Sequence, residues 1–531
     1  MRSGEVVATI LSAEGLRQGD PLSSLLFCFT VLPVYRSAVD SAPGLRAVAI
    51  VDDFNISGPH ASILTAFDHL VAESPSYGLF LGRPKCSLFW PHASPVPESL
   101  SSGCSSRSLA FIKDGLPTLG ALVSRDPVYS RGWYLRRVSE SHKTLFECLV
   151  NPLLPSHHAF VLLRSSVLPR LSYLSRVVPP EVLLPTAEWF DSSVRSTFSK
   201  RLRDPSLSAD MSLRISLPIR FGGFGLRPVV RVSPIAYACS LASAAFDIVQ
   251  LHVPASSSPS SSSSPSPSSS FSPSPSSSSS LSHSSLSSSS SLVPSSLSSS
   301  SSSVPVVMVG SGGSVVGLDV HVPLSLRSTP QSESLGRVLA SLPSSSSLPK
   351  DLSGFWSKFG LSSPPPFLQR SVLRPVEKAL YSELKDRLSS SPVSSSSFSA
   401  CLAPPSRAWL LALPSPSLYL SDREFSLASR LRLGLPPSDT LPSLCRCSAR
   451  MVEDPGHFLS CPLLRPLARV RHDRLVRLLA TLIQRAGGAA YVEPRYLEDK
   501  RPDIHAFFPD ARFMLDVCVV HPSAPSRVDL A

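Results

Sequence analysis

The sequence predicts a protein of the α+β class, in which small sheets with accompanying helices are divided by a long serine-rich segment. A pattern of strand, turn and strand with two adjacent carboxylates lies within the first sixty residues. Helical periodicity with basic residues at intervals runs through residues 130–250. Residues 255–303 are almost wholly serine with interspersed proline, and such a tract buries too little apolar surface to offset its ordering entropy. We therefore expect a folded part on each side of a disordered spacer.

Asp52 and Asp53 lie at the turn of the first predicted hairpin. Residues 49–58 combine an apolar strand, the two carboxylates and a second short strand. Paired exposed carboxylates suit a site that holds Mg²⁺ between the protein and the phosphates of a substrate. A solvated turn is the alternative for two adjacent aspartates taken alone, but the upstream segment G-L-R-Q-G-D-P-L at 15–22 favours the functional interpretation. Together the two segments predict a polymerase palm.

The order of these segments resembles the reverse transcriptases of non-LTR retrotransposons, whose palms carry G-x-x-Q-G-D-P-L and then x-x-D-D. Residues 78–86 look like the family's G-L-x-x-N-x-x-K-C segment, and residues 119–120 look like its h-L-G primer-grip turn. The resemblance implies that residues 1–125 form a partial palm, an antiparallel sheet with helices, of an RNA-directed DNA polymerase. It implies Mg²⁺ binding by the aspartate pair and a positive charge near the phosphates from Lys85. It also implies contacts to the template–primer or the incoming nucleotide from four residues: Gln18, Gly19, Leu119 and Gly120.

Two features depart from the family pattern. Ile50 replaces the tyrosine or phenylalanine that precedes the family's x-D-D. The family's first catalytic aspartate lies well upstream of the Q-G-D-P segment, and the fourteen residues before Gly15 contain no aspartate. We therefore expect the fingers and the first palm strand to be absent from this chain. A two-metal site would then lack one of its carboxylates.

Residues 126–250 resemble the helical thumb and post-thumb region of the same family. The segment L-P-I-R-F-G-G-F-G-L-R at 217–227 is similar to a turn that follows the thumb there. A phosphate-binding loop is the alternative, but no Lys-Ser/Thr pair follows and no parallel βαβ unit is evident. We expect a tight turn before a helix at 235–245. A second glycine cluster, at 310–313, lies between two valine-rich runs and predicts a hairpin turn.

The serine tract defines the middle of the chain. We assign residues 251–305 to a disordered linker and residues 306–440 to a mixed, mostly helical connector with further serine-rich breaks. A phosphorylated tail that binds a partner is the alternative for the tract.

Four potential zinc ligands lie close together in the C-terminal part: Cys445, Cys447, His457 and Cys461. Their spacing suits tetrahedral zinc, and His-x-x-x-Cys places both of its ligands on one face of a helical turn. Reduced core thiols with a surface histidine are the alternative. The arrangement resembles the knuckle that precedes the restriction-like endonuclease in one branch of non-LTR retrotransposons. Residues 441–465 are therefore expected to form a small zinc knuckle.

Asp503 and Asp516 flank a second predicted hairpin. Its strands cover residues 504–508 and 512–520 and join at a Pro-Asp pair, 509–510. With a two-residue turn the two aspartates become cross-strand neighbours, about 5 Å apart between Cβ atoms, which is close enough to share a divalent ion. An acidic hairpin on an ordinary α/β domain is the alternative interpretation.

The R-P-D segment at 501–503, followed after twelve residues by Asp516, is similar to the P-D-(D/E)-x-K nucleases and to the endonuclease of the same retroelement branch. The resemblance implies that residues 466–531 form a partial α/β restriction-like nuclease domain, with Mg²⁺ at Asp503 and Asp516. Cys518 stands where the motif has lysine. We expect this domain, like the palm, to be cut short.

The composition is consistent with a nucleic-acid partner. The 531 residues include 50 Lys and Arg against 38 acidic residues, a net charge of +12 that favours a polyanion. Ten cysteines without a leading signal peptide favour a reducing compartment, and the longest apolar run near the start is too short to span a bilayer. The resemblance implies an intracellular, nuclear protein whose partners are an RNA template, a DNA primer or target and deoxynucleotide triphosphates, with no membrane partner.

Two other functions remain open. The chain could be a non-catalytic nucleic-acid-binding remnant of a retroelement, or a residual metal-dependent DNA endonuclease in which the polymerase no longer works.

Overall fold

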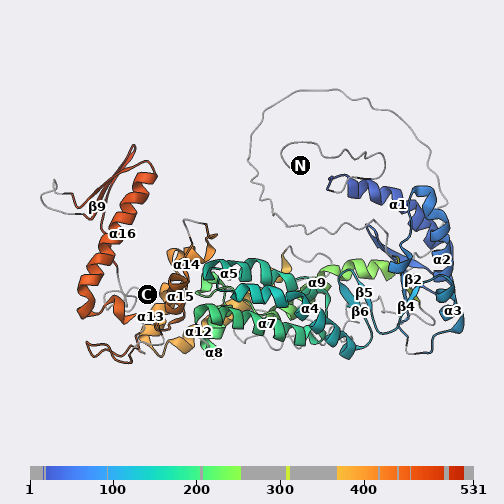
Figure 1. The fold of residues 1–531 in the computed structure, drawn as a ribbon, viewed down its shortest axis with the longest axis horizontal. Helices are drawn as coiled ribbons and strands as arrows, with labels where there is room; N and C mark the ends of the chain where they lie inside the picture. Colours follow the sequence, from blue (N-terminus) through green and yellow to red (C-terminus); the bar gives the residue numbers. More distant parts are fainter. Residues whose placement is uncertain are drawn as a thin grey trace, which may run out of the picture. The chain divides into compact units, whose positions relative to one another are not determined.

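The computed structural model describes residues 16, 19–92, 94–203, 207–252, 306–310, 367–415, 419–438, 442–451, 453–454, 456–494 and 502–519. Its mixture of helices and small sheets confirms the predicted kind of secondary structure (Figure 1). The chain divides into two compact units, residues 1–125 with 249–320 and residues 126–248 with 321–531. The predicted linker, from 253 onward, lies outside the described residues. Among the helices that are described, none has the length and apolar character needed to cross a membrane.

A five-stranded sheet forms the centre of the first unit. Its strands, in order across the sheet, are β1 (Arg46–Ile50), β2 (Asp53–Gly58), β7 (Val306–Gly310), β3 (Ser87–Phe89) and β4 (Ala110–Ile112). Of the pairs described in this sheet, β1 with β2 is antiparallel and the others are parallel.

The prediction of an antiparallel palm sheet is therefore wrong for the three strand pairs that run parallel. Helix α2 (His60–Glu73) lies between β2 and β3 in the chain, and α3 (Glu98–Ser106) lies between β3 and β4. Each helix returns the chain to the same end of the sheet, so the next strand runs parallel. Strand β7 enters the sheet from the far side of the serine tract, and the turn predicted at 310–313 lies beyond it, outside the described residues.

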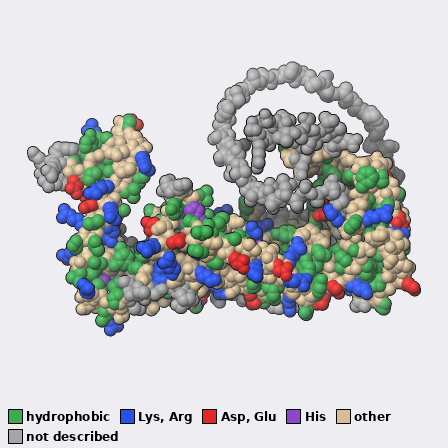
Figure 2. All heavy atoms as spheres, viewed as in Figure 1, with side chains coloured by type: hydrophobic (Ala, Val, Ile, Leu, Met, Phe, Trp, Pro, Cys, Tyr) green, Lys and Arg blue, Asp and Glu red, His purple; other side chains and the backbone are tan. Residues whose placement is uncertain are grey.

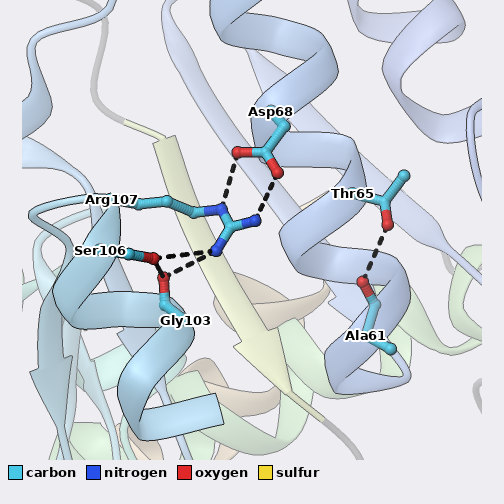
Figure 3. A network of polar contacts seen from close by, with 6 residues as sticks. All are labelled: Ala61, Thr65, Asp68, Gly103, Ser106 and Arg107. Carbon is cyan, nitrogen blue, oxygen red and sulfur yellow. Dashed lines mark hydrogen bonds and ion pairs between the residues drawn. The ribbon is translucent and has the colours of Figure 1, made fainter. Parts of the chain in front are cut away.

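Helices α1 (Ser23–Asp40), α2 and α3 contribute to the core of the first unit. Tyr35 of α1 stacks on Phe54 of β2 with ring centroids 4.0 Å apart, and both are buried. At the end of α3, Arg107 donates through Nε to Asp68 Oδ1 on α2 at 2.7 Å and through Nη1 to the Gly103 carbonyl at 2.9 Å (Figure 3). This exposed pair fixes the direction of α3 more than it adds stability, because exposed ion pairs contribute about 0–1 kcal/mol.

A helical body makes up most of the second unit. Its longer helices are α4 (Pro127–Val150), α5 (Ser156–Leu162), α7 (Pro180–Leu202), α8 (Ala209–Ser216), α9 (Val229–His252), α12 (Leu368–Leu388), α13 (Pro392–Ala400), α14 (Pro404–Leu411) and α15 (Asp422–Leu433). Phe160, Phe198 and Phe224 pack with Trp409 and Phe425 in one core. Helices from both sides of the serine tract therefore share a single core.

A small sheet-and-helix element follows the Cys/His region. Helix α16 (Arg465–Arg485) precedes β8 (Ala489–Val492), β9 (Ile504–Phe508) and β10 (Ala511–Leu515), which form an antiparallel sheet in the order β10-β9-β8. Val476, Ala480 and Ile483 of α16 pack on Ile504 and Ala506 of β9. The second predicted hairpin is confirmed, because Phe508 pairs with Ala511 across a two-residue turn.

The glycine-rich segment at 217–227 forms the tight turn that precedes α9. Gly222 has φ +78, and a Cβ on Gly223 would lie 2.1 Å from the Leu217 carbonyl oxygen. We expect Gly223→Ala to destabilise the helical body by about 1–3 kcal/mol, because the backbone around it must move to make room. Thermal unfolding measures the change. Gly132→Ala in α4 is the matched control, since its Cβ meets nothing within 4 Å and alanine favours a helix. If the two variants unfold alike, the close approach at Gly223 is not a constraint.

Candidate functional site

Asp52 and Asp53 lie at the tip of the β1–β2 hairpin, with Asp52 in the turn and Asp53 as the first residue of β2. Ile50 pairs with Asp53, so Val51 and Asp52 form a two-residue turn. Val51 has φ +56, a conformation that a β-branched residue rarely adopts. Partial burial and the charge of Asp52 raise the pKa of the Asp53 carboxyl above its usual value. Burial, and then the charge of Asp52, raise the pKa of the nearby Tyr35 to about 12.

The aspartate pair fits a divalent cation in part. Repulsion between two adjacent carboxylates is what a bound cation relieves, and Asp52 is exposed to solvent. However, Asp53 is the sole carboxylate on the described strands of this sheet. A site that holds two metal ions ordinarily draws carboxylates from separate strands.

A second small hairpin lies beside this one. β5 (Leu116–Thr118) and β6 (Ala121–Val123) pair across Leu119 and Gly120, which have φ +48 and +77. The Thr118 hydroxyl donates to Asn55 Oδ1 on β2 at 3.3 Å, two residues from Asp53. The structure thus brings the predicted primer-grip turn toward the aspartate pair.

The structure shows no hydrogen bond or ion pair between the aspartate pair and Gly19 or Lys85, the described ones among the other residues predicted for this site. Gly19 has φ +91 and precedes α1, whereas Gln18 lies outside the described residues. Lys85 is exposed in a short 3₁₀ helix (Arg83–Lys85). No contact joins Lys85 to the aspartate pair among the hydrogen bonds and ion pairs of the described residues.

The raised pKa of Asp53 predicts a pH-dependent stability. The folded state binds this proton more tightly than the unfolded state, so its stabilising contribution is present at low pH and is lost as pH rises through the folded-state pKa. We expect Asp53→Asn to unfold at a higher temperature than the wild type at neutral pH without added divalent metal, by no more than about 2 °C for so exposed a group. The difference should vanish below pH 4 or so, near the pKa of an ordinary aspartate. Asp114→Asn, which changes an exposed aspartate outside the hairpin, is the matched control.

Cys445, Cys447, His457 and Cys461 form one cluster that could bind zinc, with all four ligand atoms within 4.8 Å of one another. A tight turn places the first two cysteines: the Cys445 N–H donates to the Ala449 carbonyl and the Ser448 N–H to the Cys445 carbonyl, both at 2.8 Å. His457 begins a 3₁₀ helix (His457–Leu459), and Cys461 follows after one further residue, Ser460.

The two sulfur–sulfur distances to Cys461 in this cluster match a tetrahedral zinc site. Cys445 Sγ lies 3.7 Å and Cys447 Sγ 3.8 Å from Cys461 Sγ. Sulfur atoms at about 2.3 Å from a tetrahedral zinc are about 3.8 Å apart. Cys447 Sγ is closer to His457 Nε2, at 2.9 Å. Hydrogen bonds from the N–H and thiol of Cys447 lower the pKa of Cys445 to about 7, which favours the thiolate that binds metal.

The structure also brings Asp503 and Asp516 together, at the end of the β9–β10 hairpin. The Asp503 N–H donates to Asp516 Oδ1 at 3.3 Å, and the Val517 N–H donates to Asp503 Oδ2 at 2.6 Å. Cys518, which stands where the nuclease motif has lysine, is exposed.

His472 is a member of this acidic cluster that sequence reasoning missed. Its Nε2 lies 3.1 Å from Asp503 Oδ2, and its Nδ1 lies 3.3 Å from Asp473 Oδ1. Hydrogen bonds to Asp473 and then to Asp503 raise the pKa of His472. In the sequence, the Arg471-His472-Asp473 segment has the polar character of an ordinary solvated helix start. The signal against that view is the spacing, because His472 lies one turn before Val476 on the buried stripe of α16.

α16 also carries a basic surface. Its arginines 465, 469, 474, 477 and 485 are exposed, and blue side chains are visible along this element in Figure 2. Arg471 is half-buried and donates to the Leu459 carbonyl at 3.3 Å, which ties the helix to the Cys/His cluster.

Two retroelement proteins are similar to parts of this chain. Over 239 residues, 45% of the chain, it is 22% identical to the retrotransposable element SLACS 132 kDa protein of Trypanosoma brucei gambiense. Over 112 residues, 20% of the chain, it is 34% identical to the retrovirus-related Pol polyprotein from type-1 retrotransposable element R2 of Popillia japonica. No protein-family model matches the chain.

These distant similarities support a retrotransposon-related origin. The matched regions span 19% and 24% of the two relatives, so the chain corresponds to less than a quarter of the length of each.

Proposed function

We propose that this chain is the product of a non-LTR retrotransposon of the restriction-like-endonuclease branch and acts as an RNA-directed DNA polymerase. The observation that carries the proposal is the aspartate hairpin, which Asn55 ties to the turn at Leu119 and Gly120. Similarity to two retroelement proteins and a net charge of +12 support it.

In this proposal each part of the site has a separate task. Asp52 and Asp53 hold Mg²⁺, which when bound neutralises charge on the phosphate being transferred. Lys85 adds positive charge nearby. Gln18, Gly19 and the Leu119–Gly120 turn contact the RNA template, the DNA primer or the incoming deoxynucleotide triphosphate. The Cys/His cluster holds zinc and, with α16, binds nucleic acid in the nucleus.

Primer extension on a homopolymer RNA template with Mg²⁺ tests the proposal. We expect extension by the full chain that disappears in Asp52→Ala. Asp516→Ala is the matched control, because it removes a paired aspartate in the other unit and should extend normally. Absence of extension by the wild type, with binding of the template–primer intact, would exclude polymerase activity.

Nucleic-acid binding without synthesis is the second candidate function. The sole carboxylate on the described strands of the first sheet favours it, because a two-metal reaction needs carboxylates from more than one strand. Under this alternative, Asp52→Ala and the wild type bind a primer–template equally and neither extends it.

A metal-dependent endonuclease is the third candidate, favoured by the contacts among Asp503, Asp516 and His472. It predicts Mg²⁺-dependent nicking of supercoiled plasmid by the full chain, abolished in Asp503→Ala and retained in Asp52→Ala. Intact plasmid after incubation with the wild type would count against it.

A further inference from the structure

One face of the β10-β9-β8 sheet carries aromatic and basic side chains and is not the face that α16 covers. The register places Ala489, Phe507 and Arg512 in one cross-strand row and Tyr491, His505 and Met514 in the next. Directly opposed residues point to the same side of a sheet. Ile504 and Ala506, the neighbours of His505 and Phe507 along β9, pack on α16. The two rows therefore lie on the opposite face, which we call the outer face.

The rings of the outer face touch one another, and Tyr491 remains accessible although His505 beside it is only 8% exposed. His505 and Phe507 have ring centroids 4.1 Å apart, and Tyr491 meets Phe507 edge-on at 5.7 Å. Arg512 places its guanidinium over the Phe507 ring, 5.6 Å from the centroid. Tyr491 and Met514 are 53% and 58% exposed. The part of this face that is open to a ligand therefore consists of Tyr491, Met514 and Arg512 around the partly buried Phe507 ring.

The charges on and beside the outer face indicate what the ligand is. The two rows contain arginine and histidine but no carboxylate. The acidic cluster begins two residue pairs beyond the second row along the strands, past the pair of Ile504 with Leu515, at Asp503 and Asp516. A polyanion with flat apolar groups would satisfy the rings and the guanidinium, and its phosphates would then approach the place where a divalent ion would bind. Exposed nucleic-acid bases stack on such platforms, and arginine adds cation–π contacts.

We propose that the outer face is a stacking platform for unpaired bases of a single-stranded nucleic acid, which it leads to the acidic cluster. The inference rests on the proposed function in one respect, namely that the chain handles nucleic acid. Duplex DNA fits poorly, because its base faces are hidden in the stack. Tyr491 and Phe507 stack the bases, and Arg512 contacts the backbone or a base face.

Photocrosslinking of the full chain to an oligothymidylate that carries iodouridine tests the proposal, with the crosslinked peptides mapped by mass spectrometry. We expect crosslinks at Tyr491 or Phe507 that compete with unlabelled single strand but poorly with duplex. The combined yield of these two crosslinks should fall about tenfold in Tyr491→Ala, which corresponds to about 1.4 kcal/mol of binding free energy. The same yield should be unchanged in Tyr491→Phe. Phe513→Ala is the matched control, because Phe513 is 47% exposed on the neighbouring strand but belongs to the row of Ala506 on the α16 side.

Three results would overturn the inference. The first is crosslinks confined to α16 or the Cys/His region. The second is an equal loss in Phe513→Ala and Tyr491→Ala. The third is self-association of the chain without nucleic acid that Tyr491→Ala abolishes, because a second copy would then cover the face. If the chain neither extends primers nor nicks plasmid but crosslinks through Tyr491, the enzymatic proposals are contradicted and the stacking platform is supported.

Discussion

Replacing Cys461 with serine is expected to lower the affinity of the chain for zinc by more than about 100-fold, because loss of even an outer partner of a metal ligand costs 10- to 100-fold. The described part of residues 442–464 has only one isolated bridge and two short 3₁₀ helices, so little regular secondary structure holds it together. Structural zinc contributes about 10–16 kcal/mol at neutral pH in comparable peptides. The metal is therefore expected to maintain this region.

Metal content per purified chain and competition with a chromogenic chelator measure this effect. Cys518→Ser is the matched control, since Cys518 is exposed and lies outside the cluster. Affinity should weaken as pH falls below about 7, where the Cys445 thiolate becomes protonated. A wild-type chain that takes up no zinc, or a Cys461→Ser chain that keeps one equivalent, would contradict the assignment.

Local patterns in the sequence predicted the parts of the candidate sites that depend on local structure. The two hairpins follow from apolar residues around short polar turns, and both are present. The second has the expected two-residue loop, whereas the turn of the first consists of Val51 and Asp52 and not of the two aspartates. The Cys/His spacing likewise predicted a cluster, because its ligands lie within seventeen residues of one another. In each case the contacts that matter join residues close in the chain.

The features that the sequence did not predict depend on contacts between residues that lie far apart in the chain. β7 lies between β2 and β3, more than two hundred residues from either, and no local periodicity specifies a parallel partner so far away. His472 reaches Asp503 only because α16 lies on the sheet. Arginine is rarely buried, and nothing in the local sequence around Arg432 predicts that it is only 4% exposed.

Arg432→Met is expected to destabilise the helical body by about 3 kcal/mol or more. The guanidinium donates to carbonyls on both sides of the serine tract: Ile219 at 3.3 Å, Gly223 at 3.2 Å, Cys401 at 3.5 Å and Ser406 at 3.2 Å. Burial lowers the pKa of Arg432, because removing the charged guanidinium from water is unfavourable. The hydrogen bonds to these four carbonyls offset that desolvation. Methionine fills much of the space but leaves the four carbonyls without this donor, and each unsatisfied buried group costs about 1–3 kcal/mol.

Hydrogen exchange measures the loss where it should appear, at residues 214–226 and 401–411 together, because one side chain joins them. Arg432→Lys should fall between the wild type and Arg432→Met, since lysine keeps the charge but cannot reach separated acceptors with a planar fork. Arg423→Met, on the exposed side of the same helix, is the control and should change stability by less than about 0.5 kcal/mol. Faster exchange at 401–411 alone would contradict this role. The segments 214–226 and 401–411 would then be joined by their apolar core, and Arg432 would stabilise only residues 401–411.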